Sequence, residues 1–289
     1  MNKSVIVKPT PDLQYTKQDL MDMEKDLLRA LLRERVHHRI EVPLNAIINK
    51  WDGTPKKNFG KQAQLVFDVW KERGYNLEDP DIRWAKKYYD IAKKVQNGED
   101  IDMKVEEPKP FSNEEIKVVD RLIFERHSIR NWLDKPVPDE MMYKILEAGR
   151  AAPIGCNLDE LRFIILRTSE QKKMIKSDIS TKNATIIVIC YDERIPKIVG
   201  QDDIVPQNPG YDAAAAGDHM LLMAHALGLG GVWLSRTAKS KFTIDSGETF
   251  RKKYGLPEYI KVAMHIAIGW AEKGTIKSKR MPLSEMIIE

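Results

Sequence analysis

The sequence predicts a mixed fold of helices and strands that follows a helical N-terminal section, and three observations predict it. Residues 1–96 show helical periodicity and no strand signal. Residues 98–110, GEDIDMKVEEPKP, are polar and acidic and contain two prolines, which is typical of a linker or an extended strap. After residue 160, short runs rich in β-branched residues alternate with helical segments. The composition therefore separates two sections near residue 110.

The N-terminal section is expected to contain three helices. The second is expected to cover Lys61–Arg73. The third is expected to cover Asp81–Val95 and to end before Gly98, because glycine readily adopts the positive φ that stops a helix. The first carries apolar residues at steps of three and four in a charged background, namely Leu20, Met23, Leu27, Leu28, Leu31 and Leu32.

A further helix is expected to begin directly after the linker. Ser112 followed by Glu115 makes a capping box, in which each side chain accepts a hydrogen bond from a free backbone N–H at the start of the helix. Apolar residues continue this helix to Ile123, so it leads into the cluster Arg126-His127-Ser128-Ile129-Arg130. Another helix is expected at Asp139–Ala151.

The rest of the chain alternates strand and helix. An almost wholly apolar helix is expected at Asp212–Leu227, which is typical of a large core or a subunit interface. Gly228 is expected to end it, and the glycines that follow do not fit a dinucleotide-binding loop, because they lie between a helix and a strand in the wrong order. The predicted strands are Arg162–Leu166, Thr185–Tyr191, Val232–Ser235 and Val262–Trp270.

Composition argues against several classes of function. The 47 Lys and Arg against 43 Asp and Glu give +4, spread along the chain, so nucleic-acid binding is not expected. The cysteines Cys156 and Cys190 make no disulfide framework and no iron–sulfur cluster, which fits a cytoplasmic protein. No apolar run approaches the roughly 20 residues of a spanning helix, so no membrane association is expected. The histidines have no metal-ligand spacing, so no metal is expected.

Alternation in the arginine cluster suggests an anion site. In an extended stretch, Arg126, Ser128 and Arg130 would point to one side and present two guanidiniums and a hydroxyl together. Guanidinium groups match phosphate oxygens in two-pronged hydrogen bonds. The cluster is therefore a candidate phosphate clamp. The alternative is a solvated basic turn that pairs with Glu125 or Asp134.

Three blocks of sequence strengthen the phosphate interpretation. They are ERHSIRNWLDKPVPDEMMYKILEAGRAAPIGCN, GYDAAAAGDHMLLMAHALGLGGVWLS and YGLPEYIKVAMHIAIGWAEKGTIKSKRMPLSEMI. In this order the blocks resemble the nitroreductase family. The resemblance covers residues 112–289 and implies an FMN-binding α+β domain with a central mixed sheet flanked by helices. It also implies a homodimer with each flavin at the subunit interface. Residues 1–111 would then form a helical N-terminal extension and linker.

The resemblance assigns the phosphate end of the FMN site. It implies that the cluster with Arg126, His127, Ser128 and Arg130 holds the phosphate. Arg280, in the tail KSKRMP, would close the clamp from the other end of the chain, and Lys277 and Lys279 are weaker candidates.

The resemblance also assigns the ring end of the site. It implies that Pro153, Ile154, Gly155 and Asn157 reach the flavin ring from the partner subunit. For Asn157 the alternative is a loop residue that caps its own turn. Ser235 and Arg236 match the position beside flavin N5 and are the catalytic candidates. A Ser235 hydroxyl there would favour one-electron flavin states, whereas the alternative is that it caps the strand end.

The resemblance implies an enzyme that takes hydride from NADH or NADPH onto flavin N5 and then reduces a small organic acceptor of the nitroaromatic or quinone type. The alternatives are a specialised relative, such as a reductive dehalogenase or deiodinase or a dehydrogenase, and a non-catalytic flavin-binding interaction protein. Family members often carry Asn-x-Gln-Pro-Trp where this chain has Asn157-Leu158-Asp159-Glu160-Leu161, which affects the expected substrate preference. The N-terminal helices are expected to wrap the dimer or cover the flavin.

Overall fold

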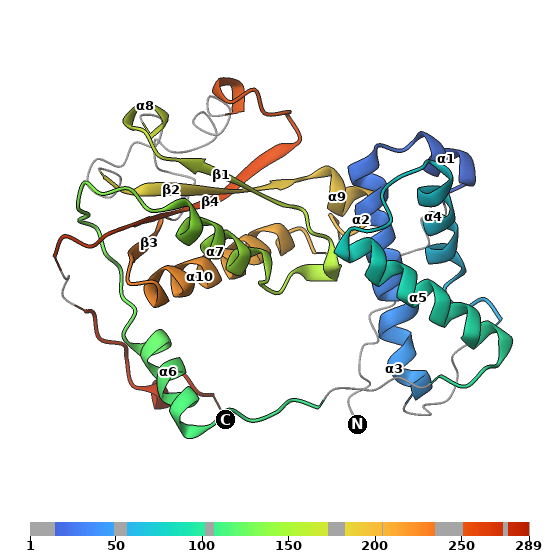
Figure 1. Cartoon of the computed structure of the whole chain (residues 1–289), viewed down its shortest axis with the longest axis horizontal. Coiled ribbons are helices and arrows are strands. Elements are labelled where there is room, and N and C mark those ends of the chain that lie inside the picture. Colours follow the sequence, from blue (N-terminus) through green and yellow to red (C-terminus); the bar gives the residue numbers. More distant parts are fainter. Residues whose placement is uncertain are drawn as a thin grey trace. The chain divides into compact units, whose positions relative to one another are not determined.

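The computed structural model describes residues 15–48, 57–101, 107–172, 183–203, 205–234, 251–273 and 277–288 (Figure 1). The chain divides into two compact units. The first unit contains residues 1–109, 154–160 and 192–209, and the second contains residues 110–153, 161–191 and 210–289. The predicted division into residues 1–111 and 112–289 stays a prediction, since two later segments of the chain return to the first unit. Among the described residues, no helix has the length and apolar composition needed to cross a membrane.

Helices make up the first unit. The predicted helices of the N-terminal section are present as α1 to α5, and two short helices, η2 and α9, come from the returning segments. Their apolar faces share one core, which includes Leu31 of α2, Trp70 of α4 and Ile82 of α5. The helices are α1 Lys17–Asp22, α2 Lys25–Val36, η1 His37–Glu41, α3 Val42–Ile48, α4 Lys61–Glu72, α5 Pro80–Asn97, η2 Gly155–Asn157 and α9 Arg194–Ile198.

One irregular turn joins α2 to α3. The segment η1 is a π-helix, and the N–H of Val42 donates to the carbonyl of His37, five residues earlier. Pro43 follows at the second position of α3. Proline has no N–H, and its ring would clash with the carbonyl four residues before it in a regular α-helix. The wider π-turn lets the chain continue past Pro43 without that clash.

The second unit combines a sheet with helices, as the sequence predicts. Its sheet has the strand order β1-β2-β4-β3, and the pairs β1–β2 and β3–β4 are antiparallel. The predicted capping box of Ser112 and Glu115 is present at the start of α6. The elements of this part are α6 Asn113–Phe124, α7 Asp139–Arg150, β1 Leu161–Leu166, α8 Ser169–Lys172, β2 Thr185–Asp192, α10 Asn208–Ala226, β3 Gly230–Leu234, β4 Ile260–Gly269 and η3 Leu283–Glu285.

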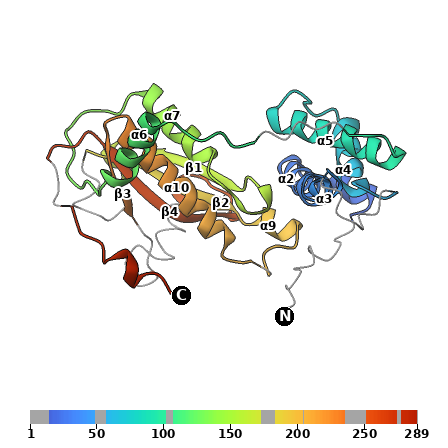
Figure 2. The same ribbon diagram turned by 90° about the horizontal axis from the view of Figure 1, so that it is seen from below.

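Two apolar clusters cover opposite faces of this sheet. Odd-numbered residues of β2, such as Ile187 and Ile189, pack in one cluster with Ile145 of α7 and Met220 of α10. Even-numbered residues of β2, such as Ile186, pack in a second cluster without these helices. This is the period of two expected of a strand buried on both faces. The views in Figures 1 and 2 agree that α7 and α10 lie on the same face of the sheet.

Candidate functional site

The arginine cluster lies on an extended segment that the sheet holds in place. Ser128 forms a parallel bridge with Gly231 of β3, and the N–H of Ile129 donates to the Gly231 carbonyl at 3.0 Å. A few residues later, the N–H of Leu133 donates to the carbonyl of Trp270, just after β4, at 2.8 Å. These bonds hold the backbone of residues 128–133 against β3 and the end of β4.

Two glycines of β3 allow close packing, Gly230 against this segment and Gly231 against α10. A Cβ on Gly230 would lie 2.7 Å from the Cβ of Ile129, and a Cβ on Gly231 would lie 2.6 Å from the Leu221 side chain. Both separations are too short for real carbon atoms. The glycine-rich stretch after α10 therefore has a packing role, and Gly228, with a φ of 78°, ends the helix as predicted.

Burial separates the apolar member of the cluster from its polar members. Ile129 is buried, whereas Ser128 and Arg126 are half-buried and Arg130 is exposed. His127 is half-buried and its Nδ1 lies 3.0 Å from the carbonyl oxygen of Glu125. The apolar member of the cluster enters the core, and the polar members remain accessible to a ligand.

The alternative of a self-paired basic turn has little support. The carboxylate of Glu125 faces Arg121 of α6, with 3.5 Å between Nε and Oε1. In the part of the chain that the structure describes, neither Arg126 nor Arg130 pairs with a carboxylate. The two guanidiniums and the nearby hydroxyl thus have the chemistry of a phosphate-binding donor set.

The structure shows fewer contacts for the other residues that the sequence predicts in the cofactor site. Arg280 lies in the exposed C-terminal tail, and among the described residues no hydrogen bond or ion pair joins it to the arginine cluster. Lys277 and Lys279 are exposed in the same tail. Ser235 and Arg236 lie outside the described residues, and β3 is described as far as Leu234.

The predicted ring-side residues form a short loop. Pro153 is exposed and ends its segment of the second unit, whereas Ile154, Gly155 and Asn157 are half-buried and belong to the first unit. The loop turns sharply, because Asn157 has a φ of 57° and Cys156 a φ of 54°. Asp159 is also left-handed, with a φ of 54°. Sequence-based prediction did not anticipate this conformation.

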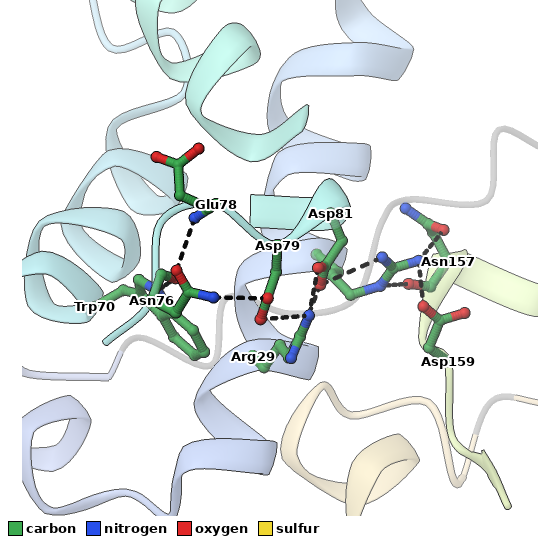
Figure 3. A network of polar contacts seen from close by, with 9 residues as sticks. Arg29, Trp70, Asn76, Glu78, Asp79, Asp81, Asn157 and Asp159 are labelled. Atoms are coloured by element: carbon green, nitrogen blue, oxygen red, sulfur yellow. Dashed lines mark hydrogen bonds and ion pairs between the residues drawn. The ribbon is translucent and has the colours of Figure 1, made fainter. Parts of the chain in front are cut away.

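Arg33, a residue of the N-terminal helices, binds this loop through hydrogen bonds and an ion pair. Arg33 of α2 donates from Nη2 to Oδ1 of Asn157 at 2.7 Å, and from Nε to the backbone oxygen of Asn157 at 3.1 Å (Figure 3). The same Nη2 lies 2.8 Å from Oδ2 of Asp159. Asn157 therefore bonds to a distant helix instead of capping its own turn. Arg33 carried no signal in the sequence, because it lies 124 residues from Asn157.

The acidic pair after Asn157 does not form an open negative patch. Asp159 faces the guanidinium of Arg33, and the side chain of Glu160 is fully buried. The charge of Asp159 is therefore paired with that of Arg33, and the effect of these two residues on substrate preference stays a prediction.

Arg33 is itself held by acidic groups. Asp81 lies at the start of α5, and its Oδ2 accepts a hydrogen bond from Nε of Arg29 of α2 at 2.8 Å. The same Oδ2 lies 3.6 Å from Nη1 of Arg33. Burial on its own would raise the pKa of Asp81, but the hydrogen bond from Arg29 and the charges of both arginines outweigh burial and lower it. Asp81 is thus ionised and interacts with both arginines of α2.

A separate cavity of about 520 Å³ lies in the first unit, lined by Tyr15, Arg35, Lys61 and Gln64 among others. None of the predicted site residues lines it. The cavity is therefore separate from the residues predicted to bind the cofactor.

Comparison with known proteins points to one family. Residues 123–188 and 208–270 match the sequence profile of the nitroreductase family. A protein of Archaeoglobus fulgidus, provisionally named an NADH dehydrogenase/NAD(P)H nitroreductase, is 31% identical over 155 residues, which cover 52% of this chain and 83% of the relative. A protein of Methanothermobacter thermautotrophicus with the same provisional name is 30% identical over 153 residues, which cover 50% of this chain and 73% of the relative.

A solved structure shows the same fold. The NADPH:FMN oxidoreductase of Vibrio harveyi, determined in complex with NAD+, superimposes with a TM-score of 0.50 at 22% identity. The match covers 58% of this chain and 75% of the other. The matched sequences and the fold agree with the three blocks that carried the resemblance in the sequence.

Proposed function

The chain belongs to the nitroreductase family, and from that premise we propose that it is an FMN-dependent oxidoreductase that takes electrons from NADH or NADPH. Its acceptor is proposed to be a small organic molecule of the nitroaromatic or quinone type. The provisional names of the two archaeal relatives and the name of the Vibrio harveyi enzyme support this proposal.

The arginine cluster carries the proposal. Arg126 and Arg130 present guanidiniums without carboxylate partners in the described part of the chain, on a segment fixed by β3. A hydrogen bond to a charged group contributes about 1.5 to 3 kcal/mol. A dianionic phosphate would satisfy both guanidiniums, and Ser128 would add a hydroxyl. These residues fit the phosphate of FMN, and Arg280 is proposed to join them.

The remaining residues would orient the ring. The loop with Pro153, Ile154, Gly155 and Asn157 is proposed to approach the ring from the other subunit of a homodimer. Ser235 and Arg236 are proposed to lie beside N5. Bound FMN would supply the hydride-accepting centre, chemistry that the cofactor itself carries, while the protein supplies binding and orientation.

A homodimer is the proposed assembly. The helix α6 has no buried residue in the single chain. Ile116, Val119 and Ile123 follow helical spacing on one face and are all exposed. The C-terminal tail also exposes Met281, Leu283 and Met286. An exposed apolar surface of this kind marks an interaction site, and a second copy of the chain is the proposed partner. Among the described residues, Cys156 and Cys190 form no disulfide, which fits a reducing compartment, and we propose that this dimer is cytoplasmic.

The cofactor proposal is tested by measuring FMN in the purified protein. We expect a yellow protein, and we expect Arg126→Met and Arg130→Met each to weaken FMN binding by about tenfold or more, the effect of one charge-assisted hydrogen bond. Arg121→Met is the matched control, because Arg121 faces Glu125 on α6 and should leave FMN affinity unchanged. A colourless protein that takes up no added FMN would overturn the proposal.

The activity is tested by anaerobic titration. NADH or NADPH should bleach the flavin absorbance, and a nitroaromatic or a quinone should restore it. Restoration only by a halogenated aromatic would instead identify the specialised dehalogenase-like relative. A flavin that neither nicotinamide bleaches would favour a non-catalytic flavin-binding protein.

A further inference from the structure

The predicted ring-side loop is enclosed by residues of the first unit. In the sequence it lies between α7 and β1, yet residues 154–160 belong to the first unit. Leu158 is 4% exposed and shares the core of α2 and α5, and Cys156 packs against the same core. A Cβ on Gly155 would lie 2.7 Å from Nδ2 of Asn208, another residue of the first unit. The N-terminal helices therefore help to set the shape of this loop.

The loop needs restraint, because its backbone is strained. Cys156, Asn157 and Asp159 all have a positive φ. Residues other than glycine adopt such conformations at a cost in free energy and keep them when the surrounding structure enforces them. Arg33 bonds the side chain and the backbone oxygen of Asn157 and pairs with Asp159. One guanidinium thus restrains two of the three strained residues.

The guanidinium also decides which way the Asn157 amide faces. Arginine can only donate hydrogen bonds, so the Asn157 atom beside Nη2 of Arg33 must be the amide oxygen. The amide nitrogen is then the atom that does not bond the guanidinium. Asn157 can therefore offer a ligand its two N–H donors, while its oxygen is already bonded.

Arg33 is fixed strongly enough to impose this orientation. Its side chain is only 12% exposed. The guanidinium lies 5.9 Å from the centre of the Trp84 ring, a cation–π distance, and its Nη1 lies 3.6 Å from Oδ2 of Asp81. A planar guanidinium held at several points loses little further freedom when it binds the loop.

We propose that Arg33 is a positioning residue of the cofactor site. It fixes the loop of residues 155–159, with its left-handed Cys156, Asn157 and Asp159, and presents the Asn157 amide as a donor to an acceptor atom of the flavin ring. The N-terminal helices thereby contribute to the ring side of the site through one arginine. This inference rests on the proposed function only for the identity of the ligand.

The test compares two arginines of the same helix. Arg33→Met removes the grip on the loop, whereas Arg29→Met removes an equal charge beside Asp81 without touching the loop. The first readout is amide hydrogen exchange of residues 155–159 in the protein without FMN. We expect exchange to rise at least tenfold in Arg33→Met and to stay unchanged in Arg29→Met. Equal exchange in both variants would overturn the proposal.

The second readout uses bound FMN. Arg33→Met should shift the visible flavin spectrum and weaken FMN binding by about tenfold, the effect of one lost hydrogen bond, because the Asn157 amide would no longer be held towards the ring. Arg29→Met should keep the wild-type spectrum and affinity. A wild-type protein that binds no FMN would defeat the proposed function, but hydrogen exchange would still decide whether Arg33 holds the loop.

A conservative variant covers the case in which Arg33→Met does not fold. Arg33→Lys retains the charge beside Asp81 and Asp159 but cannot bond both oxygens of Asn157 with one planar group. We expect a folded protein with faster exchange at Asn157 and a shifted flavin spectrum. If Arg33→Lys matches the wild type in both measurements, the proposed role of the planar guanidinium is wrong.

Discussion

The carboxylate of Asp81 couples the stability of the first unit to pH. Its pKa is lowered in the folded protein from the ordinary value of 3.8, because the bonds from Arg29 and the nearby charges outweigh burial. A lowered pKa contributes stability that is present above the unfolded value and is lost as pH falls through the folded value. We expect Asp81→Asn to cost about 1.5 to 3 kcal/mol at pH 7. In urea denaturation, this difference should shrink as pH falls below 3.8.

Asp90→Asn is the matched control for Asp81→Asn. Asp90 lies on the same helix and pairs with Lys86 at 2.7 Å, but its side chain is 52% exposed. Exposed pairs of this type contribute about 0.3 to 0.5 kcal/mol. A loss in Asp81→Asn as small as the loss in Asp90→Asn, or a loss that does not change with pH, would contradict the assignment.

Gly230 permits the close approach of the arginine cluster to β3. In Gly230→Ala, the new Cβ would meet Ile129 at 2.7 Å, so Ile129 and its polar neighbours must move. We expect a stability loss of about 1 to 3 kcal/mol, typical of overpacking. Weaker FMN binding should accompany it, since Ile129 lies between Ser128 and Arg130. Thermal unfolding and FMN titration measure the two effects.

Gly228→Ala separates packing from backbone strain. Gly228 has a φ of 78°, and nothing lies within 4 Å of the position of its Cβ. Its replacement should cost about 1 to 2 kcal/mol through left-handed strain, with unchanged FMN affinity. If both glycine variants bind FMN like the wild type, the arginine cluster does not depend on the contact with β3.

At the scale of elements, α6 is expected to hold the dimer together. Ile123 is 51% exposed on the apolar face of a helix that buries nothing within its own chain. Ile123→Asp would place a charge inside the proposed interface, where an unpaired charge is costly. Analytical ultracentrifugation should show a shift from dimer towards monomer. Lys117→Asp is the control, because it changes the charge of α6 away from Ile123 and should leave the dimer intact. Dissociation of both variants alike would contradict the assignment of this face.

Most helices and strands could be predicted from the sequence, because apolar periodicity and capping residues within each segment determine them. The β-branched run at Thr185–Tyr191 became β2 with one added residue, and Ser112 with Glu115 began α6 as expected. The π-turn before Pro43 escaped prediction, because a proline also allows a helix to end there. The grip of Arg33 on Asn157 escaped for a different reason. Arg33 is one of many charged residues on its helix, and no sequence pattern identifies a hydrogen-bond partner 124 residues away.

At the scale of the whole molecule, the chain passes between the two units several times. Residues 154–160 and 192–209 both return to the first unit after long stretches in the second. Their apolar side chains Leu158, Ile195 and Val199 enter the core of the N-terminal helices. In the sequence these residues resemble any other apolar residues of a loop or short helix. A single boundary after residue 111 was therefore the natural prediction, although it treats the N-terminal section as a separable extension.

Removal of the N-terminal helices tests whether that section is separable. A chain that starts at residue 107 would expose Leu158, Ile195 and Val199, each now at most 4% exposed. Burial of such side chains is worth about 1.5 to 3 kcal/mol each, so their sum approaches the about 5 to 15 kcal/mol that stabilises a whole domain.

We therefore expect the shortened chain to aggregate and to bind a hydrophobic dye, measured by size-exclusion chromatography and dye fluorescence. A chain that starts at residue 15 retains all the described helices and should behave like the full protein. If the shortened chain instead stays monodisperse and binds FMN normally, the two sections fold independently and the predicted boundary after residue 111 holds. Aggregation of the chain from residue 107 alone would show that the helices, rather than the residues before them, complete the core around Leu158.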